Sequence, residues 1–278
     1  MVFESEKIGK VLVIRERRRV CEGTRSGSSR RGDGSMPDVL LMLLLGVVAF
    51  AASTLAAVTG FGGAVVLLPV VVAVFGVRDA IPILTVAQLL GNAGRVVTNR
   101  REIAWPVVGW YSAGAIPVAL VGGLLFAQAP LAALTRLLGA FLLVMFAFWY
   151  FRRDRFPRLS RRGFAPLGAA SSFLSALVGS SGPLTAAFFV AHGLVKGAYI
   201  GTEALAAVVT HATKLIAYGN TSTLTADAAL AGVGLGVVMI FGSMVGKKLV
   251  DRLSEKVFVL LIQVTLVVAG VVLLVKGG

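Results

Sequence analysis

Long apolar segments dominate the chain and restrict it to a fold that spans a membrane. From Pro37 onward, mostly hydrophobic runs of about 20 residues follow one another, separated by short polar turns. Of the 278 residues 57% are hydrophobic and 14% are charged, whereas about 25% of a soluble domain is charged. The runs are continuous rather than alternating, which is typical of helices and not of a membrane β-barrel. The sequence therefore predicts an all-α, polytopic integral membrane protein.

Two glycine clusters interrupt this pattern. They are Gly60-Phe61-Gly62-Gly63 and, 119 residues later, Gly179-Ser180-Ser181-Gly182-Pro183. Glycine permits irregular backbone, which at membrane depth must be buried in protein or line a wet cavity. The pieces that follow, 63–75 and 183–192, are too short to span a bilayer and predict half-helices. Their free N–H groups and positive dipole ends make the two breaks candidate anion-binding sites.

The chain divides into two halves with the same plan, a broken hairpin followed by three full spans. The first half is 36–151, the second is 163–278, and a basic linker at 152–162 joins them. The expected segments are 37–58, 63–75, 79–99, 105–126 and 130–151, then 164–178, 183–192, 197–218, 226–246 and 256–275. Asn92-x-x-Arg95 aligns with His211-x-x-Lys214 at the same offset of 119 residues. Paired broken helices in two halves indicate a transporter binding site.

The distribution of basic residues predicts the topology. The segments 100–101, 152–162 and 247–256 are rich in Lys and Arg and are expected in the cytoplasm. The loops near 128–129 and 220–225 lack both residues and are expected outside. If each broken hairpin returns to the side that it entered from, each half crosses the membrane an odd number of times. The two repeats are then inverted relative to each other.

Residues 1–35 differ from the rest and predict a basic, disordered tail. They are either a polybasic arm at the membrane surface or an extension upstream of a start at Met36, which we favour because Met36 leads directly into the first span. Much of the net charge of +14 lies in this tail and in short loops, so it reads as a topology signal and not as a nucleic-acid site. The single cysteine, Cys21, and two histidines form no recognisable metal-ligand set, and we expect no cofactor.

Polar side chains inside the spans are the candidate substrate ligands, because ionisable groups in a membrane are costly and usually functional. In 79–99, Asn92 and Arg95 lie on one helical face with Thr85, Gln88 and Asn99. Arg95 is a fork-shaped donor suited to a carboxylate or sulfonate. The alternatives are a polar seam between helices, or a side chain that reaches out to the cytoplasmic surface.

The equivalent span, 197–218, carries His211, Lys214 and Glu203. One interpretation has His211 and Lys214 bind the anion while Glu203 or His211 carries a coupling proton. The other has Lys214 extend outward and Glu203 pair with a cytoplasmic cation. At the breaks, Gly60, Gly62, Gly63 and Gly182 would present amides to the anion, and Ser180 and Ser181 would add hydroxyl donors.

A family resemblance follows from these motifs. The pattern Gly-x-Gly-Gly…Pro in 60–69, followed by Gly76 and Ala80, resembles the TauE/SafE sulfite-exporter-like permease family. So do the stretches GSMVGKKL at 242–249 and LSEK at 253–256. The likeness covers about 40–275. It implies a permease that moves small anions, such as sulfite, sulfonates or other organosulfur compounds, across the bacterial inner membrane.

The predicted function is a secondary transporter of a small anion that works by alternating access, with the lipid bilayer as its other partner. No nucleotide-binding motif is present, so an ion gradient or the membrane potential must drive it. Two alternatives remain: a rhomboid-like intramembrane serine protease that uses Ser181 and His211, and a membrane scaffold without transport. The direction of transport and the oligomeric state, including a homodimer, stay open.

Overall fold

The computed structural model describes residues 36–59, 63–152, 158–194 and 196–249, and every element within these ranges is helical. The all-α prediction is therefore confirmed for this part of the chain. The elements are α2 (Met36–Thr59), α3 (Gly63–Asn99), α4 (Trp105–Gln128), α5 (Leu131–Arg152), the 3-10 helix η1 (Arg161–Gly163), α6 (Phe164–Val178), α7 (Gly182–Ala191), α8 (Lys196–Asn220) and α9 (Ala226–Leu249). The basic tail at 1–35 and the expected span at 256–275 lie outside the described residues, so those predictions stay untested.

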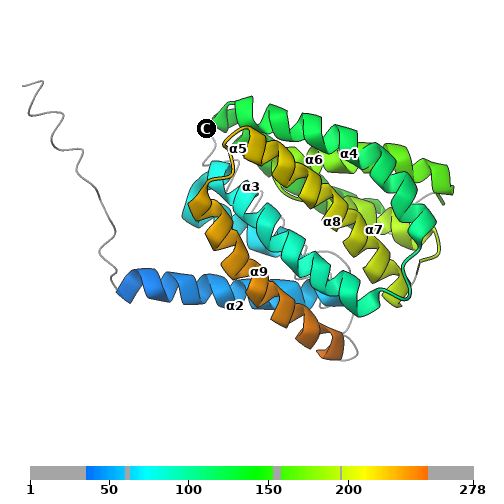
Figure 1. Cartoon of the computed structure of the whole chain (residues 1–278), viewed down its shortest axis with the longest axis horizontal. Coiled ribbons are helices and arrows are strands. Elements are labelled where there is room, and N and C mark those ends of the chain that lie inside the picture. Colours follow the sequence, from blue (N-terminus) through cyan, green and yellow to red (C-terminus); the bar gives the residue numbers. More distant parts are fainter. Residues whose placement is uncertain (1–35, 60–62, 153–157, 195, 250–278) are drawn as a thin grey trace, which may run out of the picture. The chain divides into compact units, whose positions relative to one another are not determined.

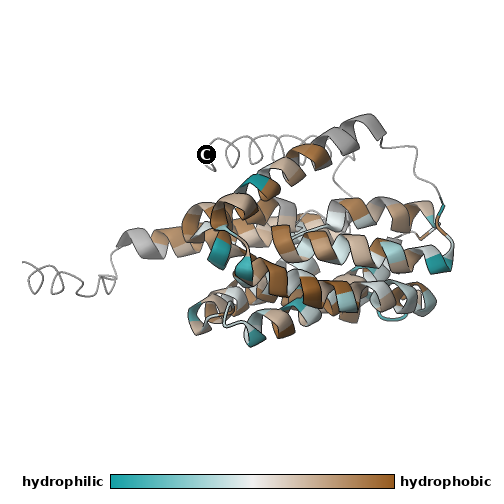
Figure 2. Cartoon of the chain, turned by 90° about the horizontal axis from the view of Figure 1, so that it is seen from above, coloured by the Kyte–Doolittle hydropathy of each residue, from teal (hydrophilic) through white to brown (hydrophobic). Residues whose placement is uncertain are grey.

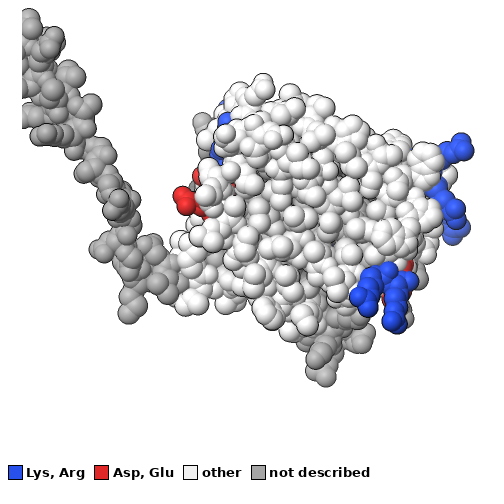
Figure 3. Space-filling view, in the orientation of Figure 1, with Lys and Arg blue, Asp and Glu red and all other residues white. Residues whose placement is uncertain are grey.

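Four of the described helices are long and apolar enough to cross a membrane. These are the segments Leu40–Ala57, Val66–Asn99, Trp105–Gln128 and Ala226–Gly246. Apolar residues predominate along the helices, while hydrophilic ones lie mostly near helix ends (Figure 2). In the face shown in Figure 3, uncharged residues cover the body of the protein, and Lys and Arg gather at its edges. This distribution suits a protein that is surrounded by lipid.

The interruption expected at 179 is present and the one near 76 has a different form, while the interruption expected at 60–62 lies outside the described residues. α6 ends at Val178, Gly179 takes a left-handed φ of 86°, and α7 begins at Gly182, as predicted for a broken helix. The expected segments 63–75 and 79–99 are the two parts of α3, which has non-helical backbone at Gly76 and kinks there. There φ is 75° and ψ is 165°, a conformation that glycine adopts without the steric cost of a Cβ. The two segments are therefore separated as predicted, but by this one residue instead of a turn over 76–78.

Contacts at one end of the protein bring together the loops that the basic residues place in the cytoplasm. The compact unit that begins at Leu43 contains these contacts. Ala104 N donates to Thr202 Oγ1 at 2.9 Å, near the beginning of α8. His192, just after α7, has its Nδ1 2.7 Å from Leu159 O, and its ring packs edge-on against Phe164 at the beginning of α6. The α6–α7 hairpin therefore begins and ends at the same end of the protein.

The opposite end contains the loops that are expected outside. Arg78, just after the kink in α3, donates to Ala129 O at 2.9 Å and to Ala127 O at 2.6 Å. Nearby, the ring of Phe126 packs against Tyr218, close to the end of α8. The first part of α3 therefore runs from Gly63 to the end opposite the one where the α6–α7 hairpin begins and ends.

The helices pack closely through small residues. α3 packs against α8 and α9, and α4 packs against α6 and α8 (Figure 1). Gly114 of α4 faces the backbone of Ala165, and Gly168 of α6 faces the backbone of Tyr111, so a Cβ at either glycine would meet main-chain atoms. Gly242 of α9 is similarly close to Phe50 of α2. Such small-residue contacts let helix backbones approach each other within a membrane.

Candidate functional site

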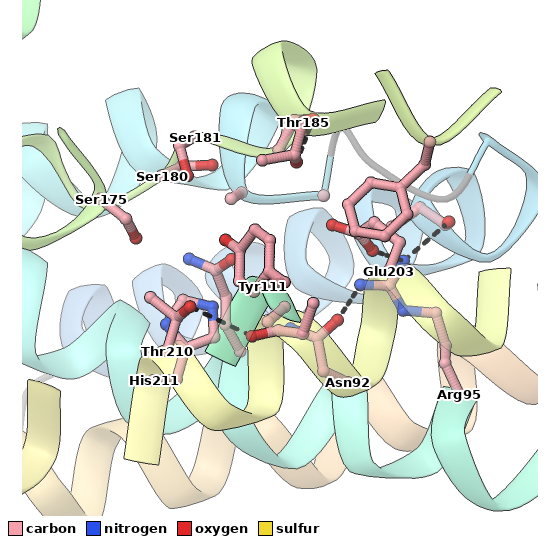
Figure 4. A pocket seen from close by; sticks show the side chains of 18 of the residues that line it. Asn92, Arg95, Tyr111, Ser175, Ser180, Ser181, Thr185, Glu203, Thr210 and His211 are labelled. Atoms are coloured by element: carbon pink, nitrogen blue, oxygen red, sulfur yellow. Dashed lines mark hydrogen bonds and ion pairs between the residues drawn. The ribbon is translucent and has the colours of Figure 1, made fainter. Parts of the chain in front are cut away.

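A pocket lies where the helix breaks meet the polar faces of α3 and α8. It contains about 600 Å³ that protein atoms leave unfilled, part of it open to solvent. α2, both parts of α3, α4, α6, α7, α8 and α9 each contribute lining residues. In Figure 4, Ser180, Ser181 and Thr185 lie along one wall, and Asn92, Arg95, Thr210 and His211 lie along the wall opposite. The pocket thus combines side chains from both halves of the sequence.

Arg95 supplies the positive charge of this pocket. Its side chain is only 11% exposed, so it does not extend to the cytoplasmic surface, which was the alternative interpretation. Nη1 donates to Ala56 O of α2 at 3.2 Å, and Nη2 donates to Oδ1 of Asn92, one helical turn earlier. Nη1 also lies 3.7 Å from Oε2 of Glu203 on α8. These contacts hold the guanidinium at the pocket wall.

The second helix break supplies neutral donors. Ser180 and Ser181 are buried in the structure and line the pocket. Ser181 is the N-cap residue of α7, and its carbonyl accepts from Leu184 N at 3.0 Å and Thr185 N at 3.2 Å, but its hydroxyl makes no capping bond. A serine at this position normally uses its hydroxyl to cap the helix. The Ser181 hydroxyl is therefore left to face the pocket beside the first turn of α7.

Lys214 is fully buried, with an exposed fraction of 0%, and does not extend outward as one interpretation held. Its Nζ donates to Ser175 O at 2.9 Å and to Ser175 Oγ at 3.1 Å, and it lies 3.5 Å from His211 Nδ1. Ser175 and His211 line the pocket, whereas Lys214 lies behind them. The ammonium is thus positioned at the last turn of α6 instead of in the pocket itself.

The contacts of Lys214 belong to a larger arrangement that satisfies the end of the broken helix α6. The last four carbonyls of a helix have no partner within it, which is costly inside a membrane. Ser175 O accepts from Gly179 N at 2.9 Å as well as from Lys214, and Ala176 O accepts from the hydroxyl of Tyr218 at 2.7 Å. A cation at this end also interacts favourably with the helix dipole. α8 therefore stabilises the break from behind.

The structure brings most of the predicted site residues together. Those that line the pocket are Gly63, Asn92, Arg95, Ser180, Ser181, Gly182, Glu203 and His211. Gly60 and Gly62 lie outside the described residues. Lys214 does not line the pocket itself but donates to Ser175, which does. Sequence reasoning missed Tyr111 of α4 and Phe189 of α7, whose rings pack together at a centroid distance of 6.0 Å. The signal that could have identified Tyr111 as a lining residue is its hydroxyl group within an otherwise apolar span.

For the protease alternative, Ser181 and His211 both line the pocket, but within the described part of the chain no hydrogen bond joins them. The described residues also include no group of three His, Cys, Asp or Glu side chains that would hold a metal ion. The arrangement as a whole, one guanidinium with several hydroxyl and amide donors, matches the chemistry of an oxyanion.

Comparison with known proteins identifies the family. The profile described as sulfite exporter TauE/SafE matches residues 45–273, which covers most of the chain. No curated protein and no solved structure matches the chain significantly. The match includes α3 to α9 and both glycine clusters, and it agrees with the resemblance found from the glycine motifs. The chain therefore belongs to the sulfite exporter TauE/SafE family and is a multi-pass membrane transporter.

Proposed function

We propose that this protein is a secondary transporter that moves a small sulfur oxyanion, such as sulfite or a sulfonate, across the bacterial inner membrane by alternating access. The observation that carries the proposal is the pocket itself. It joins a buried arginine of the first half, Arg95, to the serines of the second break, Ser180 and Ser181. A carrier requires a site at the interface of its two halves, so that rocking exposes it to either side in turn.

The donors of the pocket suit a tetrahedral or pyramidal oxyanion. Arginine offers planar, forked N–H donors that match the oxygens of a carboxylate or a sulfonate. The hydroxyls of Ser180 and Ser181 and the amide side chains of Asn92 and Gln88 add donors that carry no charge. One full positive charge with several neutral donors is an arrangement that binds an anion while still allowing its release.

The inverted-repeat architecture is part of this proposal and is supported by the pattern of helix contacts. In the repeat, α2 corresponds to α6, the second part of α3 to α8, and α4 to α9. α4 packs on α6 through Gly114 and Gly168, and the corresponding pair, α9 on α2, has Thr54 Oγ1 donating to Gly242 O at 2.9 Å. The pairs α4 with α8 and α9 with α3 correspond in the same way. For these helices, exchange of the halves leaves the set of contacting pairs unchanged, as expected for a pseudo-twofold axis, and the counterpart of α5 lies outside the described residues.

Purified protein in proteoliposomes tests the function directly. We expect uptake of sulfite or methanesulfonate along an imposed anion gradient, and a rise in thermal stability when the same anions are added. Arg95→Gln should abolish both responses, because it removes the charge at the pocket wall. Arg100→Gln is the matched control, since this exposed arginine follows α3 and lies outside the pocket. Anion uptake by Arg95→Gln at the wild-type rate, or no uptake by the wild-type protein, would refute the proposal.

A further inference from the structure

We propose that the anion occupies this pocket only when Glu203 is protonated, so that one proton moves with each anion. The inference rests on the proposed function, and it adds the coupling ion, the residue that carries it and the stoichiometry. It follows from the position of Arg95, a residue of α3 whose guanidinium lies beside the carboxylate of Glu203 on α8.

The position of Glu203 is the first observation. The residue is 6% exposed, lines the pocket from α8, and is the one carboxylate among the described residues that do so. Its Oε2 is buried and accepts no hydrogen bond within the described part of the chain. The nearest cation is Arg95, whose Nη1 lies 3.7 Å away, within ion-pair range but beyond a hydrogen bond. A buried carboxylate oxygen without a donor is costly, and it marks a group that does not serve the fold alone.

Among the described residues around Glu203, no second cation takes the place of Arg95. From α4, Tyr111 faces it, and on α8 itself Tyr199 lies within electrostatic range. His211 lines the same pocket, whereas Lys214 donates its protons to Ser175 behind the wall. α6 and α7 contribute only uncharged side chains to this pocket. Arg95 is thus the positive charge that Glu203 and an entering anion must share.

Sharing makes the two anions mutually exclusive. When an oxyanion binds at Arg95, it brings a second negative charge next to Glu203 in a site that water screens poorly. Two like charges this close to one cation favour protonation of the carboxyl group. A proton on Oε2 removes the repulsion and converts the unpartnered acceptor into an O–H donor that points toward the anion or the wall. Binding of the anion and of the proton therefore support each other.

The transport cycle follows from this exclusion. The empty carrier reorients with Glu203 ionised and paired with Arg95, so the pocket has no net charge from this pair. The loaded carrier reorients with Glu203 protonated and the anion on Arg95, so the pocket is again compensated. A pocket with the anion and an ionised Glu203, or with Arg95 unpaired, carries an uncompensated charge and is disfavoured in the membrane. The result is symport of one proton with one anion.

Proton flux in the wild-type protein is the first test. Methanesulfonate is the probe because its charge does not change near neutral pH. We expect its uptake into proteoliposomes, clamped at zero potential, to acidify a pH dye trapped inside, with one proton for each anion. We also expect apparent affinity to fall about tenfold per pH unit above the pKa of Glu203, as linkage to one proton requires. Uptake without acidification overturns the inference and leaves the proposed function intact, whereas no uptake of sulfite or methanesulfonate refutes the proposed function.

The variant Glu203→Gln separates coupling from binding. We expect it to bind the probe with an affinity independent of pH and to exchange it for the same anion trapped inside the vesicles without proton flux, because the amide cannot ionise. Net uptake should be lost, because the empty carrier would have to reorient with Arg95 unpaired. Asp227→Asn, an exposed carboxylate in the first turn of α9, is the control and should keep the wild-type proton flux. With sulfite, which itself titrates, the difference between Glu203→Gln and wild type isolates the contribution of this residue. Wild-type proton flux in Glu203→Gln would overturn the inference.

Discussion

The contact between α4 and α6 gives a prediction whose size can be worked out from the backbone. Gly114 lies in the middle of α4, and a Cβ at this position would overlap the main chain of Ala165 and come within 3.1 Å of Ala169 N. Backbone atoms of a packed helix cannot move aside as the end of a flexible side chain can. The substitution Gly114→Ala must therefore push α4 and α6 apart.

The expected cost is that of overpacking, about 1–3 kcal/mol in the free energy of unfolding. For a chain of this size that corresponds to a fall of about 2–12 °C in the midpoint of thermal unfolding. Separation of these helices also displaces Tyr111, which lines the pocket one turn away and bonds to Ser171 Oγ at 2.8 Å. We therefore expect anion uptake to fall together with stability.

Gly109→Ala is the matched control on the same helix. A Cβ at Gly109 meets nothing within 4 Å, so the exchange creates no clash in the folded protein. It lowers the conformational entropy of the unfolded chain and should stabilise the protein by about 0.4–1 kcal/mol. Thermal unfolding in detergent, followed by tryptophan fluorescence and by uptake in proteoliposomes, measures both variants. If Gly114→Ala were as stable as Gly109→Ala, the close contact of α4 and α6 would be refuted.

Three further substitutions test the helix break. Lys214→Met removes the donor to Ser175 and should destabilise the protein by about 1–3 kcal/mol. It should weaken anion binding less than Arg95→Gln does. If binding were lost while stability stayed unchanged, Lys214 would instead be a direct ligand of the anion. Gly179→Ala forces alanine into a left-handed conformation and should cost about 1–2 kcal/mol in a thermal-unfolding assay, whereas Gly46→Ala, with open space around it, should cost nothing. Ser181→Ala should change stability by less than about 0.5 kcal/mol, because its hydroxyl caps no helix, yet it should reduce sulfite binding in a thermal-shift titration.

The sequence was sufficient to predict the helices and their interruptions because both are local properties. Apolar segments of membrane-spanning length and the glycine cluster at 179–182 lead directly to α6 and α7, and the structure has them within one residue of the expected bounds. The interruption at Gly76 was predicted as a turn over 76–78, because a glycine between apolar runs marks an interruption without showing how soon the helix resumes.

The site was predicted in part, and the division has a physical reason. Helical spacing places Asn92 and Arg95 on one face, and both residues line the pocket. How deeply a side chain is buried and which group it contacts depend instead on the neighbouring helices. The spacing of His211 and Lys214 could not show that the last turn of α6 lies within reach of Lys214 Nζ. The contribution of Tyr111 depends in the same way on the packing of α4 against α6.

The low apolar content of α8 has a consequence for how the protein is made. This helix carries Glu203, His211 and Lys214 and does not qualify as a membrane span by its composition, although it packs between α3 and α4. Each central charge adds about 2.5–3.5 kcal/mol to the cost of insertion of an isolated helix. Insertion of α8 into the bilayer is therefore favourable only when Arg95 is already in place to pair with Glu203 and the end of α6 is in place to accept hydrogen bonds from Lys214. Synthesis of the first half must precede stable insertion of the second, and the charged residues of α8 at and behind the pocket are then also the ones that complete assembly of the protein.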